Sequence, residues 1–371
     1  MQEIKKRRIV LASVLKPVND TRMFEKLGCS LATVYDVHIL GTAANTPISQ
    51  GVTMHGHAPF RRMSLQRFGR VFAVMRKAWR LSPDVFMVCT HELLWAAVVV
   101  KLFTGCKVVY DVQENYGRNI RYGMAFPAPL RLLIAAWVRA KEWMTRPFVS
   151  WFFLAEAGYE NEIRFPGKHV TVLENKAILP AMPSQPRKPF GHAPITLLFS
   201  GTLAHTTGVF TAIDLARALH ACDARVSLHI IGYCAMPAVL QQLKDTIAQH
   251  PFITLTGGDQ LVPHPEIVSA IEHADVGIVA YPPNPSTANA IPTKLYEYMG
   301  HSLPMLLIDH KPWVERCAPY AAAITFRREA LDAPALLAAL RHQKFYTAPP
   351  QNIDWAAEAR RLLPVIAALL R

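Results

Sequence analysis

Between Asn289 and Gly300 the sequence reads Asn-Ala-Ile-Pro-Thr-Lys-Leu-Tyr-Glu-Tyr-Met-Gly, and apolar runs flank it at 276–280 and 305–308. Pro292 suits the first turn of a helix, whereas the Pro-, Asn-, Ser- and Thr-rich residues 282–289 are typical of a loop. The segment therefore predicts a strand, a loop, a helix and a second strand. That order is the repeating unit of a parallel α/β sheet.

The same alternation extends along the whole chain of 371 residues. Further strand-like runs lie at 8–13, 37–40, 85–89, 107–110, 149–153, 170–173, 195–200, 226–231 and 253–256. This pattern predicts two Rossmann-like α/β domains that face each other across a cleft. We expect the active site between them, because open α/β sheets bind ligands at the carboxyl ends of their strands.

A cluster of prolines suggests where one domain ends and the next begins. Pro180, Pro183, Pro186, Pro189 and Pro194 lie close together, a composition suited to a linker. We therefore predict an N-terminal domain at 1–180, a linker at 181–194 and a C-terminal domain at 195–350. Residues 351–371 form a helical pattern that could pack back on the N-terminal domain.

The composition excludes several classes of protein. With 51% hydrophobic and 18% charged residues the chain is globular, and no apolar run is long enough to span a bilayer. The six cysteines form no Cys-x-x-Cys pair, and His91, His205 and His264 lack the spacing of metal ligands. We expect a cytoplasmic protein with reduced thiols, no metal site and no cofactor.

Positive charge is concentrated in the first half of the chain, where residues 1–190 carry a net charge of +14 and residues 191–371 carry −1. Between residues 61 and 80 basic side chains alternate with large apolar ones, which predicts a basic amphipathic helix. The side chains expected to face an anionic membrane include Arg67, Arg70, Phe72, Arg76 and Trp79. The alternatives are a helix that packs on the core and shows arginine to water, and a nucleic-acid surface, for which no reader motif is present.

The helix predicted to begin after Pro292 has the features of a diphosphate site. Backbone amides at a helix N-terminus, here those of Thr293, Lys294 and Leu295, bind anions, and the Lys294 ammonium would add charge. Glu297 lies one turn further on, where it could accept both hydroxyls of a ribose. The alternative is an ordinary surface ion pair between Lys294 and Glu297.

These residues resemble a known family, the retaining GT-B glycosyltransferases of glycosyltransferase family 4. The segment from Pro292 to Met299 with Leu303-Pro304 is similar to that family's donor helix, and Glu297 matches its ribose-binding glutamate. Phe199-Ser-Gly-Thr-Leu203 with Thr207-Gly208-Val209 resembles the loop that opens the second domain. Asp20 to Lys26 and Tyr110 to Asn115 resemble acceptor-side loops.

The resemblance implies a GT-B fold and a retaining, metal-independent transfer of a sugar from a nucleoside diphosphate donor to a hydroxyl acceptor. The implied acceptor is a lipid-linked intermediate of bacterial cell-surface polysaccharide synthesis, at the inner face of the cell membrane. The resemblance and the local patterns together predict catalytic residues Lys294, Asn289, Glu114 and Asp111; donor residues Glu297, Thr293, Leu295, Gly201 and Thr202; and acceptor-side residues Asp20, Arg22, His91 and Gln113. No nucleic-acid partner is expected.

Several positions depart from the family pattern. Asn289 stands where the first glutamate is usual, Thr202 and Thr207 replace the usual Arg and Lys, and Gln113 replaces a common histidine. Either Lys294 and the helix amides would then stabilise the leaving diphosphate, or another arginine would take the place of the missing cations. A nucleotide-sugar 2-epimerase and a non-catalytic, membrane-bound pseudo-transferase are the alternative functions.

Other sites also keep two interpretations. Asp111 and Glu114 are expected either to orient a substrate or to cap a helix. His91 is expected either to contact a ligand or to have a structural role. Arg22 contacts an acceptor phosphate or pairs with Asp20. Gly201 forms a tight turn or lets the backbone approach a phosphate.

Overall fold

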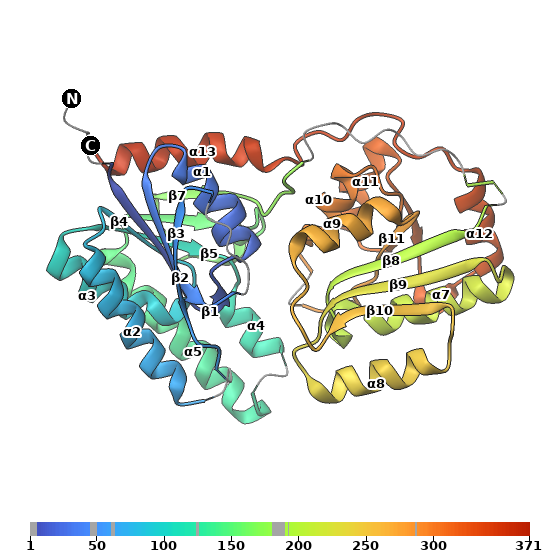
Figure 1. Cartoon of the computed structure of the whole chain (residues 1–371), viewed down its shortest axis with the longest axis horizontal. Coiled ribbons are helices and arrows are strands. Elements are labelled where there is room, and N and C mark those ends of the chain that lie inside the picture. Colours follow the sequence, from blue (N-terminus) through green and yellow to red (C-terminus); the bar gives the residue numbers. More distant parts are fainter. Residues whose placement is uncertain are drawn as a thin grey trace. The chain divides into compact units, whose positions relative to one another are not determined.

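The computed structural model of the chain describes residues 6–44, 50–60, 64–123, 126–179, 190–191, 193–285 and 288–371. The chain divides into two compact units (Figure 1). Unit 1 consists of Met1–Asn175 and Trp355–Arg371, and unit 2 consists of Lys176–Asp354. The C-terminal helix is therefore part of unit 1. Most of the predicted linker, residues 181–189 and 192, lies outside the described residues.

The described residues of unit 1 form a seven-stranded parallel sheet of order β3-β2-β1-β4-β5-β6-β7. The strands are β1 (Arg8–Pro17), β2 (Asp36–Thr42), β3 (Val52–His57), β4 (Val85–Val88), β5 (Lys107–Val112), β6 (Trp151–Leu154) and β7 (Val170–Val172). Successive residues of β1 alternate between two buried clusters, because side chains of a strand point to opposite faces.

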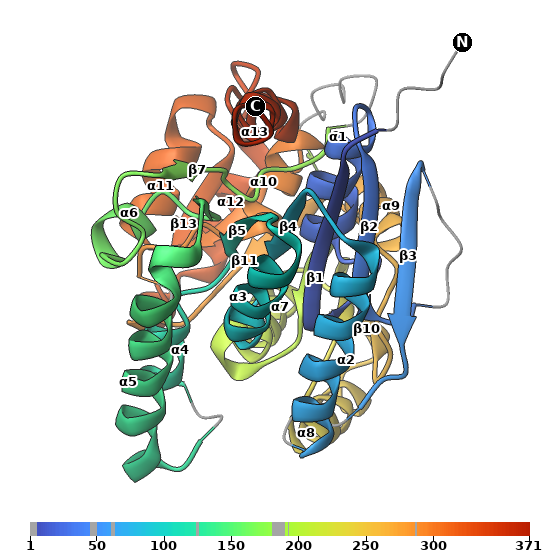
Figure 2. The same cartoon turned by 90° about the vertical axis from the view of Figure 1, so that its left-hand side faces the viewer.

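Helices cover both faces of this sheet, as the pairing of parallel strands through crossovers requires. One face carries α2 (Gln66–Leu81), α3 (Leu94–Thr104) and α5 (Ala128–Thr145), which lie side by side (Figure 2). The opposite face carries the π-helical η1 (Thr21–Gly28), α1 (Cys29–Ala32) and α13 (Trp355–Leu369). The shorter helices are η2 (His91–Leu93), α4 (Tyr116–Tyr122), η3 (Arg146–Phe148) and α6 (Tyr159–Glu162).

The described residues of unit 2 form a six-stranded parallel sheet of order β10-β9-β8-β11-β12-β13 around a single buried cluster. Its strands are β8 (Ile195–Thr202), β9 (Val226–Tyr233), β10 (Ile253–Gly258), β11 (Val276–Val279), β12 (Met305–Ile308) and β13 (Ala323–Phe326). Its helices are η4 (His205–Thr207), α7 (Val209–Cys222), α8 (Pro237–Ala248), α9 (His264–His273), α10 (Thr293–Gly300), α11 (Lys311–Cys317), η5 (Ala318–Tyr320), η6 (Arg328–Ala330) and α12 (Ala333–His342).

Every strand-like run predicted from the sequence is confirmed as a strand, and the predicted C-terminal helix is α13. Two strands escaped prediction. β3 contains two histidines, a glycine and a threonine, and Thr325 interrupts the apolar residues of β13, so neither strand is an unbroken apolar run. Among the described residues, no helix is long and apolar enough to cross a membrane.

Candidate functional site

The helix α10 begins at Thr293, as the sequence predicts from Pro292 at its N-cap. The loop before it is held by α11, since the Trp313 indole donates a 2.6 Å hydrogen bond to the carbonyl of Ala290. No side chain of the described residues caps the helix, so these residues close its first turn only in part. One prediction here is wrong: the Leu295 amide already donates to the carbonyl of Pro292 at 2.9 Å, and its side chain is buried in the core.

Lys294 is a buried cation of unit 2. It is only 6% exposed, and its Nζ has no hydrogen-bond partner in the part of the chain that the structure describes. Two aromatic rings face the ammonium, with Nζ 3.9 Å from the ring centroid of Phe199 and 5.2 Å from that of Tyr281. Burial lowers the pKa of Lys294 to about 7, while the Glu297 carboxylate opposes this shift. A buried cation that makes no ion pair with any described residue is suited to an incoming anion.

Glu297 lies one turn beyond Lys294 on α10 and is partly exposed. Its Oε1 lies 3.1 Å from Nε2 of His264, the first residue of α9. The histidine therefore holds the carboxylate in one orientation. Sequence reasoning set His264 aside because it lacks metal-ligand spacing, and nothing in the local pattern joins it to a residue that lies 33 positions away.

The loop after β8 approaches Lys294 from the other side. Gly201 has φ +103°, a conformation that favours glycine, and a Cβ built there would lie 3.8 Å from Lys294 Cε. Thr202 is exposed, and its carbonyl accepts a 2.7 Å hydrogen bond from the Thr207 hydroxyl. The Thr207 hydroxyl therefore holds the two ends of this loop together. Threonine is uncharged, so neither residue supplies the positive charge that Arg and Lys usually provide here.

Two contacts fix α10 against the sheet of unit 2. The Tyr298 hydroxyl lies 2.9 Å from Ser200 Oγ, at the end of β8. The ring of Tyr298 packs on Gly277 of β11, where a Cβ would come within 2.5 Å of it. Because Tyr298 is buried, these contacts set the position of Lys294 and Glu297 on the same helix. Asn289 is exposed in the loop before α10, and Thr293 is half-buried at the first helical position.

Unit 1 contains a buried ion pair at the ends of its central strands. Arg22 and Asp111 are 2% and 0% exposed. The guanidinium donates to both carboxylate oxygens, from Nη2 at 2.7 Å and from Nε at 3.0 Å, and Nη1 donates to the carbonyl of Leu173. Both predicted roles are corrected, because Arg22 pairs with Asp111 rather than with Asp20 or a phosphate. Asp111 has no exposed oxygen with which to orient a substrate.

Further polar residues continue the hydrogen-bond network of Arg22 and Asp111 toward the surface of unit 1. Gln113 donates from Nε2 to Asp111 at 2.7 Å and accepts from the Lys16 ammonium. The Asp20 carboxylate lies 3.5 Å from Lys16 Nζ and also accepts from the backbone amides of Arg22 and Met23. Asp20 therefore caps η1. Lys16 was not identified from the sequence, where it only ends an apolar run.

His91 and Glu114 occupy different surroundings. His91 is mostly buried, accepts a 2.7 Å hydrogen bond from the Lys141 ammonium at Nδ1, and meets the ring of Tyr116 edge-on. Burial, followed by the charges of Lys141 and Arg67, lowers its pKa to about 3, so the ring is neutral near pH 7. Glu114 is exposed and accepts from the Asn119 amide at 3.3 Å.

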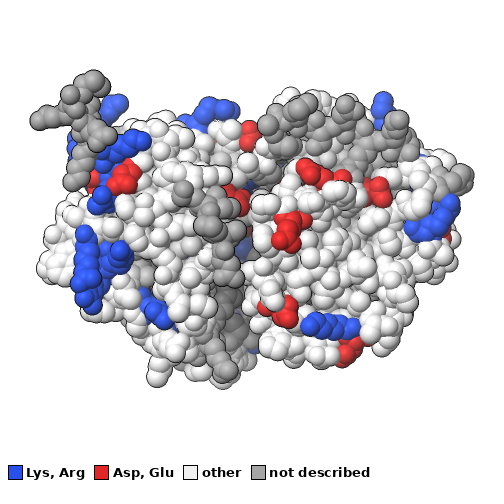
Figure 3. Space-filling model, viewed as in Figure 1, with Lys and Arg blue, Asp and Glu red and all other residues white. Residues whose placement is uncertain are grey.

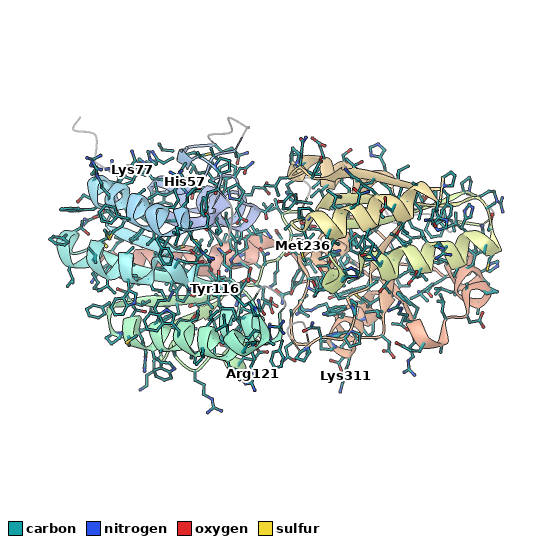
Figure 4. All side chains as sticks on the ribbon, turned by 90° about the horizontal axis from the view of Figure 1, so that it is seen from below. His57, Lys77, Tyr116, Arg121, Met236 and Lys311 are labelled. Carbon is teal, nitrogen blue, oxygen red and sulfur yellow. The ribbon has the colours of Figure 1, made fainter. Side chains whose placement is uncertain are left out.

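In the basic helix α2, some of the side chains pack on the core and others are exposed. Val74 and Ala78 are buried, with Val71 and Met75 packed beside them, whereas Phe68, Phe72 and Trp79 are 75%, 61% and 49% exposed. Arg76 is exposed and Arg70 is partly exposed. The prediction that Arg67 faces a membrane is wrong, because its side chain is only 25% exposed and pairs with Glu92 of η2. Lys77, also exposed, lies at the periphery of unit 1 (Figure 4).

Within the described ranges, no group of three or more His, Cys, Asp or Glu side chains is arranged to hold a metal ion.

Two parallel α/β units in one chain are the architecture of the GT-B fold, and comparison with solved structures establishes that fold for this protein. Sucrose-phosphate synthase from Thermosynechococcus elongatus matches with a TM-score of 0.70 at 13% identity, over 98% of this chain and 99% of that one. Anabaena HepE in complex with UDP-glucose matches with a TM-score of 0.63 at 12% identity, over 97% and 99%.

A UDP-forming α,α-trehalose-phosphate synthase from Burkholderia xenovorans is also similar, with a TM-score of 0.64 at 13% identity, over 99% of this chain and 100% of that one. No protein-family model and no curated protein sequence matches the chain. At these identities the likeness concerns the fold, and the chemistry has to be argued from the site.

Proposed function

We propose that the protein is a glycosyltransferase that uses a nucleoside diphosphate sugar as donor. The observation that carries this proposal is Lys294, a buried cation at the start of α10 that finds no hydrogen-bond partner among the described residues. A donor diphosphate placed there would accept hydrogen bonds from the ammonium and from first-turn amides of the helix. Glu297, oriented by His264, would accept the ribose hydroxyls.

The proposed reaction needs charge stabilisation on the leaving group. The acceptor hydroxyl oxygen forms a bond to the anomeric carbon while the bond from that carbon to the diphosphate oxygen breaks. The hydroxyl proton passes to the departing diphosphate, and attack from the side of the leaving group retains the configuration. Negative charge grows on the diphosphate in the transition state, where Lys294 and the helix dipole stabilise it. We propose no metal and no cofactor for this step.

A thermal-shift and calorimetry panel of nucleotides and nucleotide sugars tests the donor site. A ligand at about 100 times its dissociation constant stabilises the folded protein by about 2.7 kcal/mol, which raises the melting temperature measurably. Absence of any shift across the panel would contradict the proposal. Turnover of donor alone would favour the epimerase, and donor binding without turnover by any acceptor would favour the pseudo-transferase.

We further propose that unit 1 binds an anionic membrane at the inner face of a bacterial cell membrane, where the acceptor is a lipid-linked intermediate of polysaccharide synthesis. Large apolar side chains are exposed on all three helices of one face, α2, α3 and α5: Phe68, Phe72, Trp79, Trp95, Leu102, Phe103, Leu132, Leu133, Trp137 and Trp143. Basic side chains gather over α2 and α3 of unit 1 (Figure 3). Exposed aromatic rings beside Arg and Lys are typical of a membrane interface.

Vesicle flotation tests the membrane surface. Replacement of Arg76, Lys77 and Arg80 by Glu should release the protein from anionic vesicles, since each basic residue contributes about 1 kcal/mol near such a surface. A matched control replaces Arg164, Lys168 and Arg360, which are exposed elsewhere on unit 1, by Glu. If the unmodified protein ignores anionic vesicles at low salt, the membrane proposal is wrong while the donor site is unaffected.

A further inference from the structure

Unit 1 contains a pocket between α4 and α5 that the donor chemistry does not use. Its volume is about 520 Å³, within the range of sites for small ligands. It is lined by Asn115, Gly117, Arg118, Arg121, Tyr122, Leu132, Ala135, Ala136 and Arg139. The lining combines three arginines with an apolar wall and includes no acidic side chain.

The arginines are positioned by different means. Arg118 pairs through Nη1 with Glu162, and its buried Nε has no hydrogen-bond partner within the described ranges. Arg139 donates to Asn115 at 2.8 Å and to Glu142 at 2.9 Å. Arg121 is exposed, makes no ion pair among the described residues, and lies with its guanidinium carbon 5.5 Å from the ring centroid of Tyr122.

The balance of charge at the pocket favours an anion. Glu162 offsets Arg118, but Glu142 offsets Arg139 only in part, because burial raises the pKa of the Glu142 carboxyl to about 7. Arg121 has no acidic partner at all among the described residues. Three guanidinium groups near one space can bind a phosphate in the forked geometry that arginine provides.

The opposite wall of the pocket is a stripe of α5. Leu132, Ala135, Ala136 and Arg139 recur at the spacing of one helix face, and the two alanines leave the space open. Leu132 is 60% exposed although it lines the pocket, and Leu133 and Trp137 beside it are 69% and 58% exposed. An apolar stripe that ends in arginine suits a molecule with an apolar chain and a charged head.

We propose that this pocket binds a phosphate-bearing amphiphile, with its phosphate on Arg121 and Arg118 and its apolar chain along Leu132 and Ala136 of α5. The inference rests on the proposed function, in which the acceptor is lipid-linked, and it adds the place in unit 1 where a phosphate and an apolar chain of that acceptor bind. Arg121 is exposed, so such a molecule can reach its guanidinium from solvent.

Calorimetry with decyl phosphate below its micelle concentration tests the site, with decanol and inorganic phosphate as probes of the chain and of the head alone. Decyl phosphate should bind at least about tenfold more tightly than either, because only it makes both sets of contacts. Arg121→Glu should weaken binding about tenfold or more, whereas Arg164→Glu, at an exposed arginine outside the pocket, should not.

A second pair of variants tests the pocket without changing charge. Ala136→Trp fills the space, and Ala140→Trp places the same side chain one turn further along α5, outside the lining. Only the first should abolish decyl phosphate binding. Both positions are exposed, so folding should survive in each, and the melting temperature of each variant checks this.

Three results would overturn the inference: equal binding of inorganic phosphate, equal binding of decanol, or unchanged binding in Ala136→Trp. Binding of a nucleotide sugar, measured in the same samples, separates the two proposals. If the nucleotide sugar binds and decyl phosphate does not, the pocket assignment fails and the donor site stands. If decyl phosphate binds through Arg121 and no nucleotide sugar binds, the proposed function fails.

Discussion

Each unit of the molecule contains a buried cation near the end of its sheet. The cation of unit 1 forms an ion pair, whereas the cation of unit 2 forms none with the described residues. In unit 1 the Arg22 guanidinium meets both oxygens of Asp111. In unit 2 the Lys294 ammonium faces two aromatic rings, feels the Glu297 carboxylate one turn away, and has no hydrogen-bond partner among the described residues. Burial lowers the pKa of both groups, but the Asp111 carboxylate outweighs burial for Arg22, whose pKa is raised, while that of Lys294 falls to about 7.

This difference in pairing indicates that Arg22 stabilises the fold, whereas Lys294 is available to bind a ligand. A buried charge is costly unless it is paired, so the paired Arg22 is part of the folded framework. For Lys294, the unfavourable free energy of burying a charge is not offset by an ion pair with any residue that the structure describes while no anion is bound. An anion that binds beside it therefore restores the missing interaction, which is the physical reason to assign the donor site to unit 2.

The largest expected effect is on folding and comes from breaking the pair in unit 1. Asp111→Ala leaves Arg22 buried without its carboxylate and should lower the free energy of unfolding by about 3–5 kcal/mol. Denaturant titration measures this loss. Asp214→Ala, which removes an exposed acid of unit 2, is the control and should change stability by less than about 1 kcal/mol. A small loss in Asp111→Ala would mean that the pair is not essential to the fold.

The opposite pattern is expected at Lys294. Lys294→Met should weaken nucleotide-sugar binding by about 1.5–3 kcal/mol and lower turnover more than it raises the Michaelis constant. Its stability without ligand should be unchanged or higher, since an unpaired buried ammonium is removed. Calorimetry and thermal melting measure the two effects, with Lys311→Met at an exposed lysine as the control. Equal donor affinity in Lys294→Met and the unmodified protein would rule out the assignment.

A somewhat smaller effect is expected at Glu297, whose partner His264 lies in the same unit. Glu297→Ala should weaken nucleotide binding by about 1–3 kcal/mol, because the ribose hydroxyls lose a charged acceptor. His264→Ala should weaken it less, since it only frees the carboxylate to move. Calorimetry with a nucleotide, and with the corresponding free diphosphate as control, separates ribose from diphosphate contacts. A loss of diphosphate binding in Glu297→Ala would contradict the ribose role.

The smallest expected effect concerns pH. The pKa of Lys294 is about 7 in the folded protein, so below that pH the ammonium is already formed and nucleotide-sugar affinity is constant. Above it, binding must be accompanied by proton uptake, and affinity should fall by at most about tenfold per pH unit. Calorimetry between about pH 6 and pH 9 in two buffers measures both affinity and proton uptake. Glu297→Ala should keep a falling profile, and Lys294→Met should show none.

Local patterns in the sequence determined the elements of this protein and the start of its donor helix. Alternating apolar runs predicted eleven of the strands, and Pro292 set the beginning of α10. The net charge of the first half, and its basic amphipathic helix, were equally visible without a structure. These features depend on neighbouring residues only, which is why a single sequence carries them.

Only the tertiary structure decided which side chains meet. The bond from Arg22 to Asp111 joins residues 89 positions apart, and that from His264 to Glu297 spans 33. Such contacts depend on the order and register of the parallel strands, which no local pattern encodes. The Lys294 ammonium, which no described residue hydrogen-bonds, is likewise visible only in the folded unit, because burial and partners depend on everything packed around a side chain.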